Sequence, residues 1–355
     1  MKPTYLVTGG AGFIGSWFVT AMRQSRTARI VNLDALTYAG NPDNLAELQN
    51  DPDHILVHGN INDGELVARL LAEHRPDAVV HFAAESHVDR SILDPDAFIR
   101  TNVLGTGVLL GAALRYWNGL PAGRKDRFRF LHVSTDEVFG SLGPQDPPFT
   151  ESTPYDPKSP YSASKAGSDH LVRAFFATYG LPVLVTNCSN NYGPRQFPEK
   201  LIPLMICNAV SGKPLPLYGK GENVRDWLHV EDHCAAIALV LEKGRAGETY
   251  LIGGKAERTN LDLVTSLCAV LDRLAPSNAG PHANAITFVT DRPGHDLRYA
   301  VSPAKIERDL GWTPKHTLET GLEDTVRWYL ANADWVRRVQ DGTYRRWMEI
   351  NYAKR

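Results

Sequence analysis

The sequence contains few cysteines and lacks a long hydrophobic segment. Its four cysteines, at positions 188, 207, 234 and 268, lie far apart, without a Cys-x-x-Cys pair or a histidine at zinc-ligand spacing. This distribution argues against a disulfide framework and against a zinc site, so we predict reduced thiols and no bound metal. No stretch approaches the roughly 18 apolar residues of a membrane span, and the first residues lack the pattern of a secretory signal. We therefore expect a cytoplasmic protein without a membrane anchor.

A strong charge of one sign is also absent. The 355 residues carry a formal net charge of −2, with 43% hydrophobic and 22% charged residues. Such a balance is typical of a soluble globular protein of about two domains, and it attracts neither nucleic acid nor an anionic membrane surface. We expect a small-molecule partner, whose phosphates, if it carries any, are bound by local cations.

Short runs of Val, Ile and Leu alternate with helical segments along the first half of the chain. These runs lie at 5–7, 29–33, 55–57, 78–82, 130–133 and 183–185. Continuous apolar strands separated by helices indicate a parallel sheet that is covered on both faces. We predict an α/β fold with a Rossmann-type doubly wound parallel sheet over 1–190, to which the chain returns around 225–253. A smaller, irregular α/β substrate domain is expected mainly over 191–355, where prolines interrupt the pattern.

A glycine-rich turn follows the first predicted strand. Gly9, Gly12 and Gly15 stand three residues apart and open a helix. Glycines at this point let backbone N–H groups approach a pyrophosphate, which the positive end of the helix favours. Asp34 ends the second strand, where its carboxylate can accept hydrogen bonds from an adenosine ribose. These residues predict a dinucleotide site.

The residues after Asp34 indicate which dinucleotide binds. Ala35 and Leu36 follow it, and no arginine lies nearby in the sequence. A 2′-phosphate would therefore meet a carboxylate and no cation, so we predict NAD as the cofactor and not NADP.

A tyrosine and a lysine are spaced to share one face of a helix. Ser159 is a good N-cap, Pro160 fits the first helical position and Gly180 ends the helix, so Tyr161 and Lys165 lie one turn apart. A phenol has a pKa of about 10, and a neighbouring ammonium stabilises its phenolate. We expect Lys165 and an oxidised nicotinamide to lower the Tyr161 pKa, so that Tyr161 moves a proton to and from a hydroxyl.

Two adjacent carboxylic acids follow a buried strand. Asp136 and Glu137 stand directly after Thr135. An acid pair can remove a C–H proton and protonate a departing hydroxyl, and close negative charges push one of the two pKa values upward. Because a C–H beside an alcohol carbon is not acidic until that alcohol is oxidised, this elimination requires a preceding oxidation. The combination with Tyr161 indicates an oxidation-dependent dehydratase.

Several longer segments carry a family resemblance. With the glycine turn and the Tyr161–Lys165 pair, they resemble the extended, nucleotide-sugar-modifying branch of the short-chain dehydrogenase/reductase superfamily over nearly the whole chain. Within that branch the sequence is similar to the dTDP-glucose 4,6-dehydratase family. The segments that carry this likeness are 83–91, 135–137, 189–194, 197–203, 225–227 and 291–296.

The resemblance implies a role for each catalytic residue. Tyr161 would take the O4 proton during oxidation at C4 of dTDP-glucose, Thr135 would hydrogen-bond the same oxygen, and Lys165 would hold the nicotinamide ribose. Glu137 would then remove the C5 proton and Asp136 would protonate the leaving C6 hydroxyl. Return of hydride to C6 regenerates NAD and yields the 4-keto-6-deoxy sugar nucleotide, which feeds deoxysugar biosynthesis.

The resemblance also implies binding residues. Besides the glycines, Asp34, Ala35, Leu36, Tyr161 and Lys165, the NAD contacts would be Phe13, Ile14, Thr37, Asn60, Ile61, Ala83, Ala84, Glu85, Thr101 and Asn191. Besides Thr135, the substrate contacts would be Ser86, Asn190, Lys200, Leu201, Pro216, Tyr218, Arg225, Asn260, Arg292 and His295. Asn60 departs from the family, which usually has aspartate there, so we expect a weaker or altered adenine contact. Ala35 replaces a common lysine, which should matter little for NAD.

Other functions remain open at this point. A UDP-glucose 4,6-dehydratase would share every catalytic residue, whereas a 4-epimerase or a decarboxylase needs no acid pair for loss of water. A non-catalytic NAD sensor would need none of Asp136, Glu137, Tyr161 and Lys165. The resemblance further implies a homodimer, in which the helical segments 96–117 and 159–179 of both copies form a four-helix interface.

Overall fold

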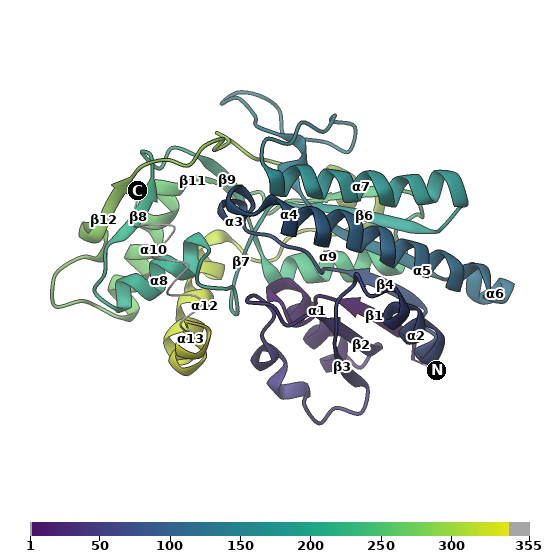
Figure 1. Ribbon diagram of the computed structural model, residues 1–355. Helices are drawn as coiled ribbons and strands as arrows, with labels where there is room; N and C mark the ends of the chain where they lie inside the picture. The colour runs from purple at the N-terminus through teal and green to yellow at the C-terminus, as the bar shows by residue number, and fades with distance from the viewer. Residues whose placement is uncertain (1, 341–355) are drawn as a thin grey trace.

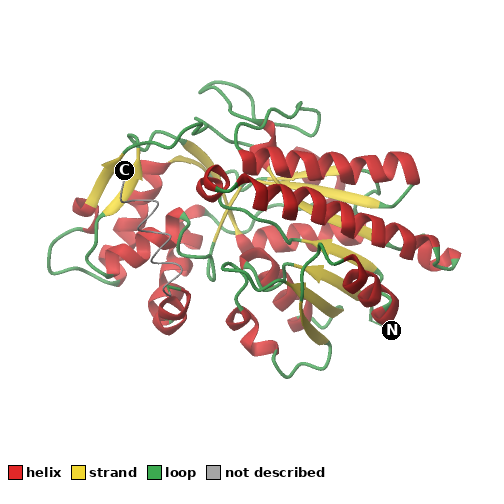
Figure 2. Ribbon diagram, viewed as in Figure 1, coloured by secondary structure: helices red, strands yellow, loops and turns green. Residues whose placement is uncertain are grey.

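The computed structural model describes residues 2–340, and its centre is a seven-stranded parallel β-sheet (Figures 1 and 2). The strands follow the order β3-β2-β1-β4-β5-β6-β10, and each pairs in parallel with its neighbours. This is the doubly wound arrangement, so the predicted fold class is confirmed. The bounds are β1 Thr4–Thr8, β2 Arg29–Asp34, β3 His54–His58, β4 Ala78–His81, β5 Arg129–Thr135, β6 Val183–Cys188 and β10 Thr249–Ile252.

Helices cover both faces of this sheet (Figure 2). Because helices lie on both sides, the strands are apolar in continuous runs. On one face, α1 (Phe13–Gln24) and α9 (Val230–Lys243) share a core with side chains that include Val7, Phe18, Ile30, Ile237 and Val240. On the other face, α2 (Gly64–His74), α5 (Thr106–Asn118) and α7 (Pro160–Tyr179) contribute to a core with Leu6, Val31, Leu71, Leu109 and Val172.

Local signals set the limits of α7. The Ser159 hydroxyl accepts from the backbone N–H of Ser162 at 3.1 Å, and the Ser162 hydroxyl accepts from the N–H of Ser159 at 3.0 Å. Pro160 occupies the first turn, and Gly180 ends the helix in the left-handed region at φ 72°. This capping box and glycine stop match the predicted helix, which places Tyr161 and Lys165 one turn apart, both buried.

One helical run is more apolar than expected. α4 (Pro95–Phe98), the π-helical turn η2 (Ile99–Gly105) and α5 form a continuous run of 24 residues whose hydropathy, 1.4, and length would suffice to cross a membrane. The expectation that no stretch approaches this length is therefore wrong. Core helices of soluble proteins can be equally long and apolar, and 44% of the most apolar part of this run is buried within the protein.

The later part of the chain builds a second region around smaller sheets. β7 (Asn190–Tyr192), β9 (Val224–His229) and β11 (Glu257–Thr259) form one sheet, and β8 (Leu215–Tyr218) pairs with β12 (Ile286–Val289). Within the expected return to the first domain, β10 joins the large sheet and α9 packs on one of its faces, whereas β9 pairs with β7 and β11. The helices of this region are α8 Leu201–Val210, α10 Asn260–Leu274, α12 Leu318–Ala331 and α13 Ala333–Val339.

The remaining elements are short. They are η1 Pro42–Leu48, α3 Val88–Leu93, α6 Ala122–Lys125, η3 Asp136–Phe139, η4 His282–Ala285 and α11 Ala304–Leu310. Because all seven strands of the large sheet run parallel, their carboxyl ends meet at one edge, where α/β proteins bind ligands. The second region lies against this edge (Figure 1).

Candidate active site

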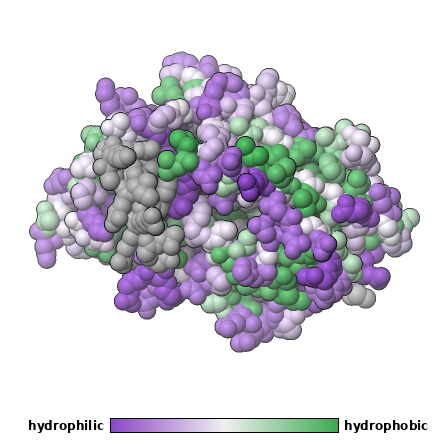
Figure 3. Space-filling model, viewed as in Figure 1, coloured by the Kyte–Doolittle hydropathy of each residue, from purple (hydrophilic) through white to green (hydrophobic). Residues whose placement is uncertain are grey.

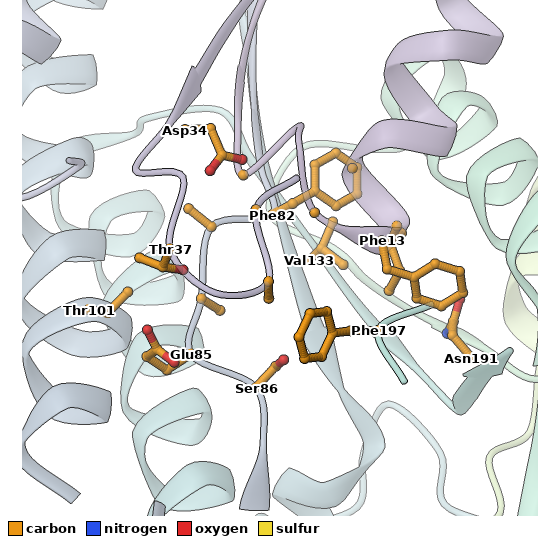
Figure 4. Close-up of a pocket in the computed structure, with 18 of the residues that line it drawn as sticks. Phe13, Asp34, Thr37, Phe82, Glu85, Ser86, Thr101, Val133, Asn191 and Phe197 are labelled. Atoms are coloured by element: carbon orange, nitrogen blue, oxygen red, sulfur yellow. The ribbon is translucent and has the colours of Figure 1, made fainter. Parts of the chain in front are cut away.

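A cleft runs along the carboxyl ends of the large sheet and is closed on the far side by the segment 195–200. Figure 4 shows Asp34 and Thr37 on one side of it and Phe197 and Asn191 on the other. Nearly all predicted cofactor and catalytic residues line this cleft. They are Gly9, Gly12, Phe13, Ile14, Gly15, Asp34, Ala35, Thr37, Asn60, Ile61, Ala83, Ala84, Glu85, Thr101, Asn191, Thr135, Asp136, Glu137, Tyr161 and Lys165, joined by the predicted substrate residues Ser86, Asn190 and Lys200.

The glycine-rich turn fits a dinucleotide pyrophosphate. Gly9 has φ +72°, and a Cβ there would lie 2.6 Å from the backbone nitrogen of Ala83. A Cβ at Gly15 would lie 2.2 Å from the Gly9 carbonyl oxygen, so only glycine lets the turn approach β4 and α1 this closely. No described side chain caps the N-terminus of α1, which leaves its N–H groups available to an anion.

Asp34 is fixed at the end of β2 by backbone N–H groups. Its Oδ2 accepts from Ala11 and its Oδ1 from Leu36, both at 2.8 Å. Burial raises the pKa of Asp34, and these two N–H groups oppose the shift. Leu36 does not line the cleft, so its part in the site is this backbone bond to Asp34.

The environment of Tyr161 differs from the one expected. Its hydroxyl is hydrogen-bonded to the Thr135 side chain, and burial, followed by the charge of Glu137, raises the Tyr161 pKa well above its usual value. Lys165 is not among the largest influences on this pKa, and its ammonium donates instead to the carbonyl of Val133 at 2.9 Å. The expected lowering of the phenol pKa by Lys165 is therefore not found, and the shift that proton transfer requires is left to a cationic ligand in the cleft.

Asp136 and Glu137 have different surroundings although they are adjacent. Asp136 is 1% exposed, and burial together with the charge of Glu137 raises its pKa well above the usual range. Within residues 2–340 its Oδ2 has no hydrogen-bond partner, while Oδ1 accepts from the Thr135 hydroxyl at 3.3 Å. Burial also raises the Glu137 pKa, but the charges of Arg292, Arg225 and Lys200 oppose that shift. Both pKa values are therefore raised, that of Asp136 well above its usual range, while the three cations act in favour of the ionised form of Glu137.

The predicted cations of the second region therefore surround the catalytic acids, although only Lys200 lines the cleft. Lys200 donates to the Ser86 carbonyl at 2.9 Å. Arg225 donates to the Asp296 carbonyl at 3.0 Å and lies 4.2 Å from the centre of the Tyr299 ring. Arg292 lies 3.6 Å from Asp89.

The other predicted substrate residues lie outside the lining of the cleft. Tyr218 donates to Asp89 at 2.9 Å, and the His295 ring meets the Tyr218 ring edge-on at 6.1 Å. Leu201 and Asn260 begin α8 and α10, and Pro216 lies in β8. All five residues belong to the second region.

The side-chain oxygen of Asn60, at the end of β3, is already engaged. It accepts from the backbone N–H of Asn62 at 2.9 Å and from the Asn62 amide at 3.0 Å. Both lone pairs of this oxygen are thus occupied, so the side chain can offer a ligand only its NH₂ donor.

Sequence reasoning missed several lining residues. Phe197, Glu199 and Ser189 lie within segments that carry the family likeness but were not predicted as site residues, and Cys188 is the last residue of β6. Trp335 had no local signal, because its segment reaches the cleft from the far end of the chain. The other unselected lining residues include Asn44, Arg195 and Gln196.

One cluster of potential metal ligands occurs in the described part of the chain. Ligand atoms of His229, Glu231 and His316 lie within 4.8 Å of one another. The two imidazole rings are stacked at 4.0 Å, and His229 Nδ1 accepts from the Glu231 N–H at 3.4 Å. Stacked rings do not direct their lone pairs at a common point, so we assign no metal to them.

Comparison with known proteins identifies the family. The family profile described as GDP-mannose 4,6 dehydratase matches residues 6–325. The dTDP-glucose 4,6-dehydratase of Xanthomonas campestris pv. campestris is 62% identical over 343 residues, 96% of this chain and 97% of that protein. The dTDP-glucose 4,6-dehydratase 1 of Escherichia coli is 54% identical over 358 residues, 99% of each chain.

Solved structures agree. The structure of DesIV, a dTDP-glucose 4,6-dehydratase from Streptomyces venezuelae with NAD and TYD bound, has a TM-score of 0.85 at 50% identity and covers 95% of this chain and 99% of that chain. The UDP-glucose 4-epimerase of Thermotoga maritima has a TM-score of 0.81 at 29% identity and covers 93% and 99%. With the cleft described above, these matches place the chain in the dTDP-glucose 4,6-dehydratase family of the extended short-chain dehydrogenases/reductases.

Proposed function

We propose that this chain is an NAD-dependent hydro-lyase that converts dTDP-glucose into dTDP-4-keto-6-deoxy-glucose. Relatives at 54–62% identity over nearly the full length carry this activity in their names. The observation that carries the proposal is the acid pair. Asp136 is held toward its protonated form beside Tyr161, while three cations favour an ionised Glu137. An epimerase has no use for such a pair.

The cleft residues account for the proton movements. Tyr161, hydrogen-bonded to Thr135, accepts the O4 proton. Glu137 then takes the C5 proton, which the neighbouring C4 ketone acidifies, and protonated Asp136 gives its proton to the departing C6 hydroxyl. NAD, when bound, would supply the hydride transfer from C4 and back to C6, while a proton returns to C5. In this proposal Lys165 and Asp34 hold its two riboses.

Binding of the sugar nucleotide is assigned to the second region. Lys200, Arg225 and Arg292 would meet the diphosphate, since each of them already acts on the Glu137 charge. Pro216 and Tyr218 would flank the base, with Asn190, Asn260, Ser86, Leu201 and His295 as further contacts. In this proposal residues 1–190 with the returning α9 and β10 bind NAD, and 191–355 mainly bind the nucleotide sugar.

The first test is turnover without added cofactor. Purified protein incubated with dTDP-glucose should release a 4-keto-6-deoxy product whose mass is lower by one water, and this would also show that NAD is retained. If product forms only with UDP-glucose, the substrate assignment is wrong and the chemistry stands. If neither is dehydrated after NAD is added, the dehydratase assignment fails.

We further propose a homodimer formed through the helices α4, η2, α5 and α7. Figure 3 shows hydrophobic surface gathered over these helices. Exposed apolar side chains there include Ile99 (48%), Leu104 (58%) and Phe176 (38%), and Leu93 (61%) stands at the end of α3, just before α4. Such a patch is typical of a protein interface, and burying it explains the apolar character of 95–118.

The dimer is tested by the mass in light scattering. Wild type should show twice the chain mass, and Leu104→Lys should shift it toward the monomer, because the new charge would be buried in the interface. Val210→Lys is the control, since Val210 is 55% exposed at the end of α8, away from the patch. A monomeric wild type would disprove this interface.

A cytoplasmic location, suggested by the four unpaired cysteines, is tested by cell fractionation.

A further inference from the structure

The segment that follows β2 and precedes β3 lines the cleft next to Asp34. We call residues 35–48, which include η1, the cofactor strap; its residues Ala35, Thr37 and Asn44 are among those that line the cleft. The second region contacts the strap at separate points. Arg195 pairs with Glu47 at 2.9 Å, and the Tyr38 ring meets the Phe197 ring edge-on at 5.6 Å. The strap is thus held from both sides of the cleft.

The most buried of these contacts comes from the C-terminal helix α13. The indole N–H of Trp335 donates to Asn44 Oδ1 at 3.0 Å. Trp335 is 6% exposed and Asn44 3% exposed, and both line the cleft. Trp335 packs against Trp328 and Tyr329 of α12, with ring centroids 5.1 and 6.2 Å away, so its position is fixed by the core of the second region.

Asn44 carries this contact into the glycine-rich turn. Its Nδ2 donates to the Ala11 carbonyl at 3.0 Å, and the same carbonyl accepts from the Asn41 N–H at 3.0 Å. The Ala11 N–H in turn donates to Asp34. A continuous chain of hydrogen bonds therefore runs from Trp335 through Asn44 and Ala11 to the carboxylate that faces the adenosine ribose.

We propose that Trp335 is a positioning residue that closes the strap over bound NAD and retains the cofactor through the catalytic cycle. The proposal rests on the proposed function, and it assigns a role to a residue that lies outside every catalytic motif. The proposed reaction requires NAD to stay bound between its two hydride transfers. Hydride taken from C4 must return to C6 of the same sugar, so a cofactor that left in its reduced form would strand the oxidised intermediate.

The contact acts selectively on the closed strap. When the strap is open, water can satisfy the Asn44 oxygen. When it is closed, that oxygen is buried, and among residues 2–340 the donor that it meets is the indole N–H of Trp335. Loss of the N–H therefore disfavours the closed, cofactor-holding state more than the open one. A role in folding alone would weaken both states alike.

The test compares two tryptophan variants of the full chain. Trp335→Phe keeps an aromatic ring and removes the N–H. Trp312→Phe is the matched control, because Trp312 is also 6% exposed and its indole N–H donates to the Asp232 carbonyl at 3.2 Å, outside the cleft. The NAD content after gel filtration and the rate of NAD release into an excess of unlabelled NAD are measured, together with the melting temperature of each protein.

We expect NAD release from Trp335→Phe to be about tenfold faster than from wild type, with kcat restored within about twofold at saturating NAD. Trp312→Phe should release NAD at the wild-type rate. Equal release rates in all three proteins would overturn the proposal, as would a kcat of Trp335→Phe that added NAD does not restore. A wild type that binds no NAD would instead disprove the proposed function, so the two failures are distinguishable.

Discussion

Adjacent residues of similar chemistry acquire different roles from what surrounds them. Asp136 lies against Glu137 and Asp226, whose charges add to the effect of burial and raise its pKa. Glu137 extends toward Arg292, Arg225 and Lys200, which oppose the effect of burial. A pair of titratable groups whose environments push their pKa values apart is the usual basis for assigning an acid and a base.

Asp136→Asn should separate oxidation from elimination. The amide cannot protonate the C6 hydroxyl, so we expect turnover to fall by about 10² to 10⁴ while C4 oxidation continues. Stopped-flow absorbance should then show NADH accumulating on the enzyme after dTDP-glucose is mixed in. The exposed Asp126→Asn should behave as wild type. If no NADH appears in Asp136→Asn, Asp136 is not the C6 acid.

Asn60→Asp should strengthen NAD binding. The Asn60 oxygen is used by Asn62, and aspartate would keep that contact while offering a second oxygen to the adenine amino group. We expect the NAD dissociation constant, measured by calorimetry on the apoprotein, to fall about threefold to tenfold. Asn62→Asp provides the comparison at a neighbouring position. An unchanged constant would mean that Asn60 does not meet the adenine.

At the scale of elements, α7 rests on a buried polar group beneath the catalytic residues. Asp169, one turn after Lys165 and fully buried, accepts from Tyr155 at 2.7 Å and from the Asn187 amide at 3.0 Å. Asn187 also donates to the Thr135 carbonyl at 3.0 Å, so the Asn187 amide joins Asp169 of α7 to the end of β5. Burial lowers the Lys165 pKa, and the charge of Asp169 is the main effect that opposes it.

Asp169→Asn should therefore destabilise the fold. The substitution places a neutral amide where Tyr155 and Asn187 donate to a buried carboxylate. Removing one partner of a buried charged contact lowers the free energy of unfolding by about 3 to 5 kcal/mol. The control is Asp156→Asn, which removes an exposed ion pair with Lys158 and should cost less than about 1 kcal/mol. Urea unfolding measures both. A cost at Asp169 as small as that at Asp156 would contradict the assigned role.

At the scale of the whole molecule, several histidines are folded into the interior in neutral form. Burial lowers the pKa of His233 to about 3, and His87, His132 and His229 have pKa values lowered to about 4, with burial as the largest cause. An unfolded histidine has a pKa of about 6.5. Below that pH the unfolded chain binds protons that the folded chain does not, so stability is lost as the pH falls from 6.5 toward 3.

His233 provides the test of this pH dependence. Between pH 7 and pH 5, His233 should lower the free energy of unfolding by about 2 kcal/mol. The reason is that over about 1.5 pH units the imidazole is protonated in the unfolded chain and neutral in the folded one. His233→Gln removes the titration, so the difference in unfolding free energy between pH 7 and pH 5 should shrink by about that amount. Urea unfolding at the two pH values measures it. Equal differences in wild type and variant would show that His233 does not titrate as described.

Local sequence determined much of this protein by itself. Three local patterns carried the prediction: the three glycines, the apolar runs and the helix signals at Ser159 and Gly180. Each acts over a few residues, so neighbouring residues in the sequence were enough to predict the sheet, the cofactor turn and the shared helix face of Tyr161 and Lys165. The acid pair was visible for the same reason. Here backbone geometry and strand direction place the residues, and both follow from local pattern.

Tertiary structure alone decided how those residues are charged and held. The direction of the Lys165 ammonium toward Val133, the three cations near Glu137 and the contact from Trp335 to Asn44 all join segments far apart in the chain. The pairing of β9 away from the large sheet is of the same kind. Desolvation and charge proximity depend on distances in space, and a pattern of neighbouring residues carries no information about distances between remote segments.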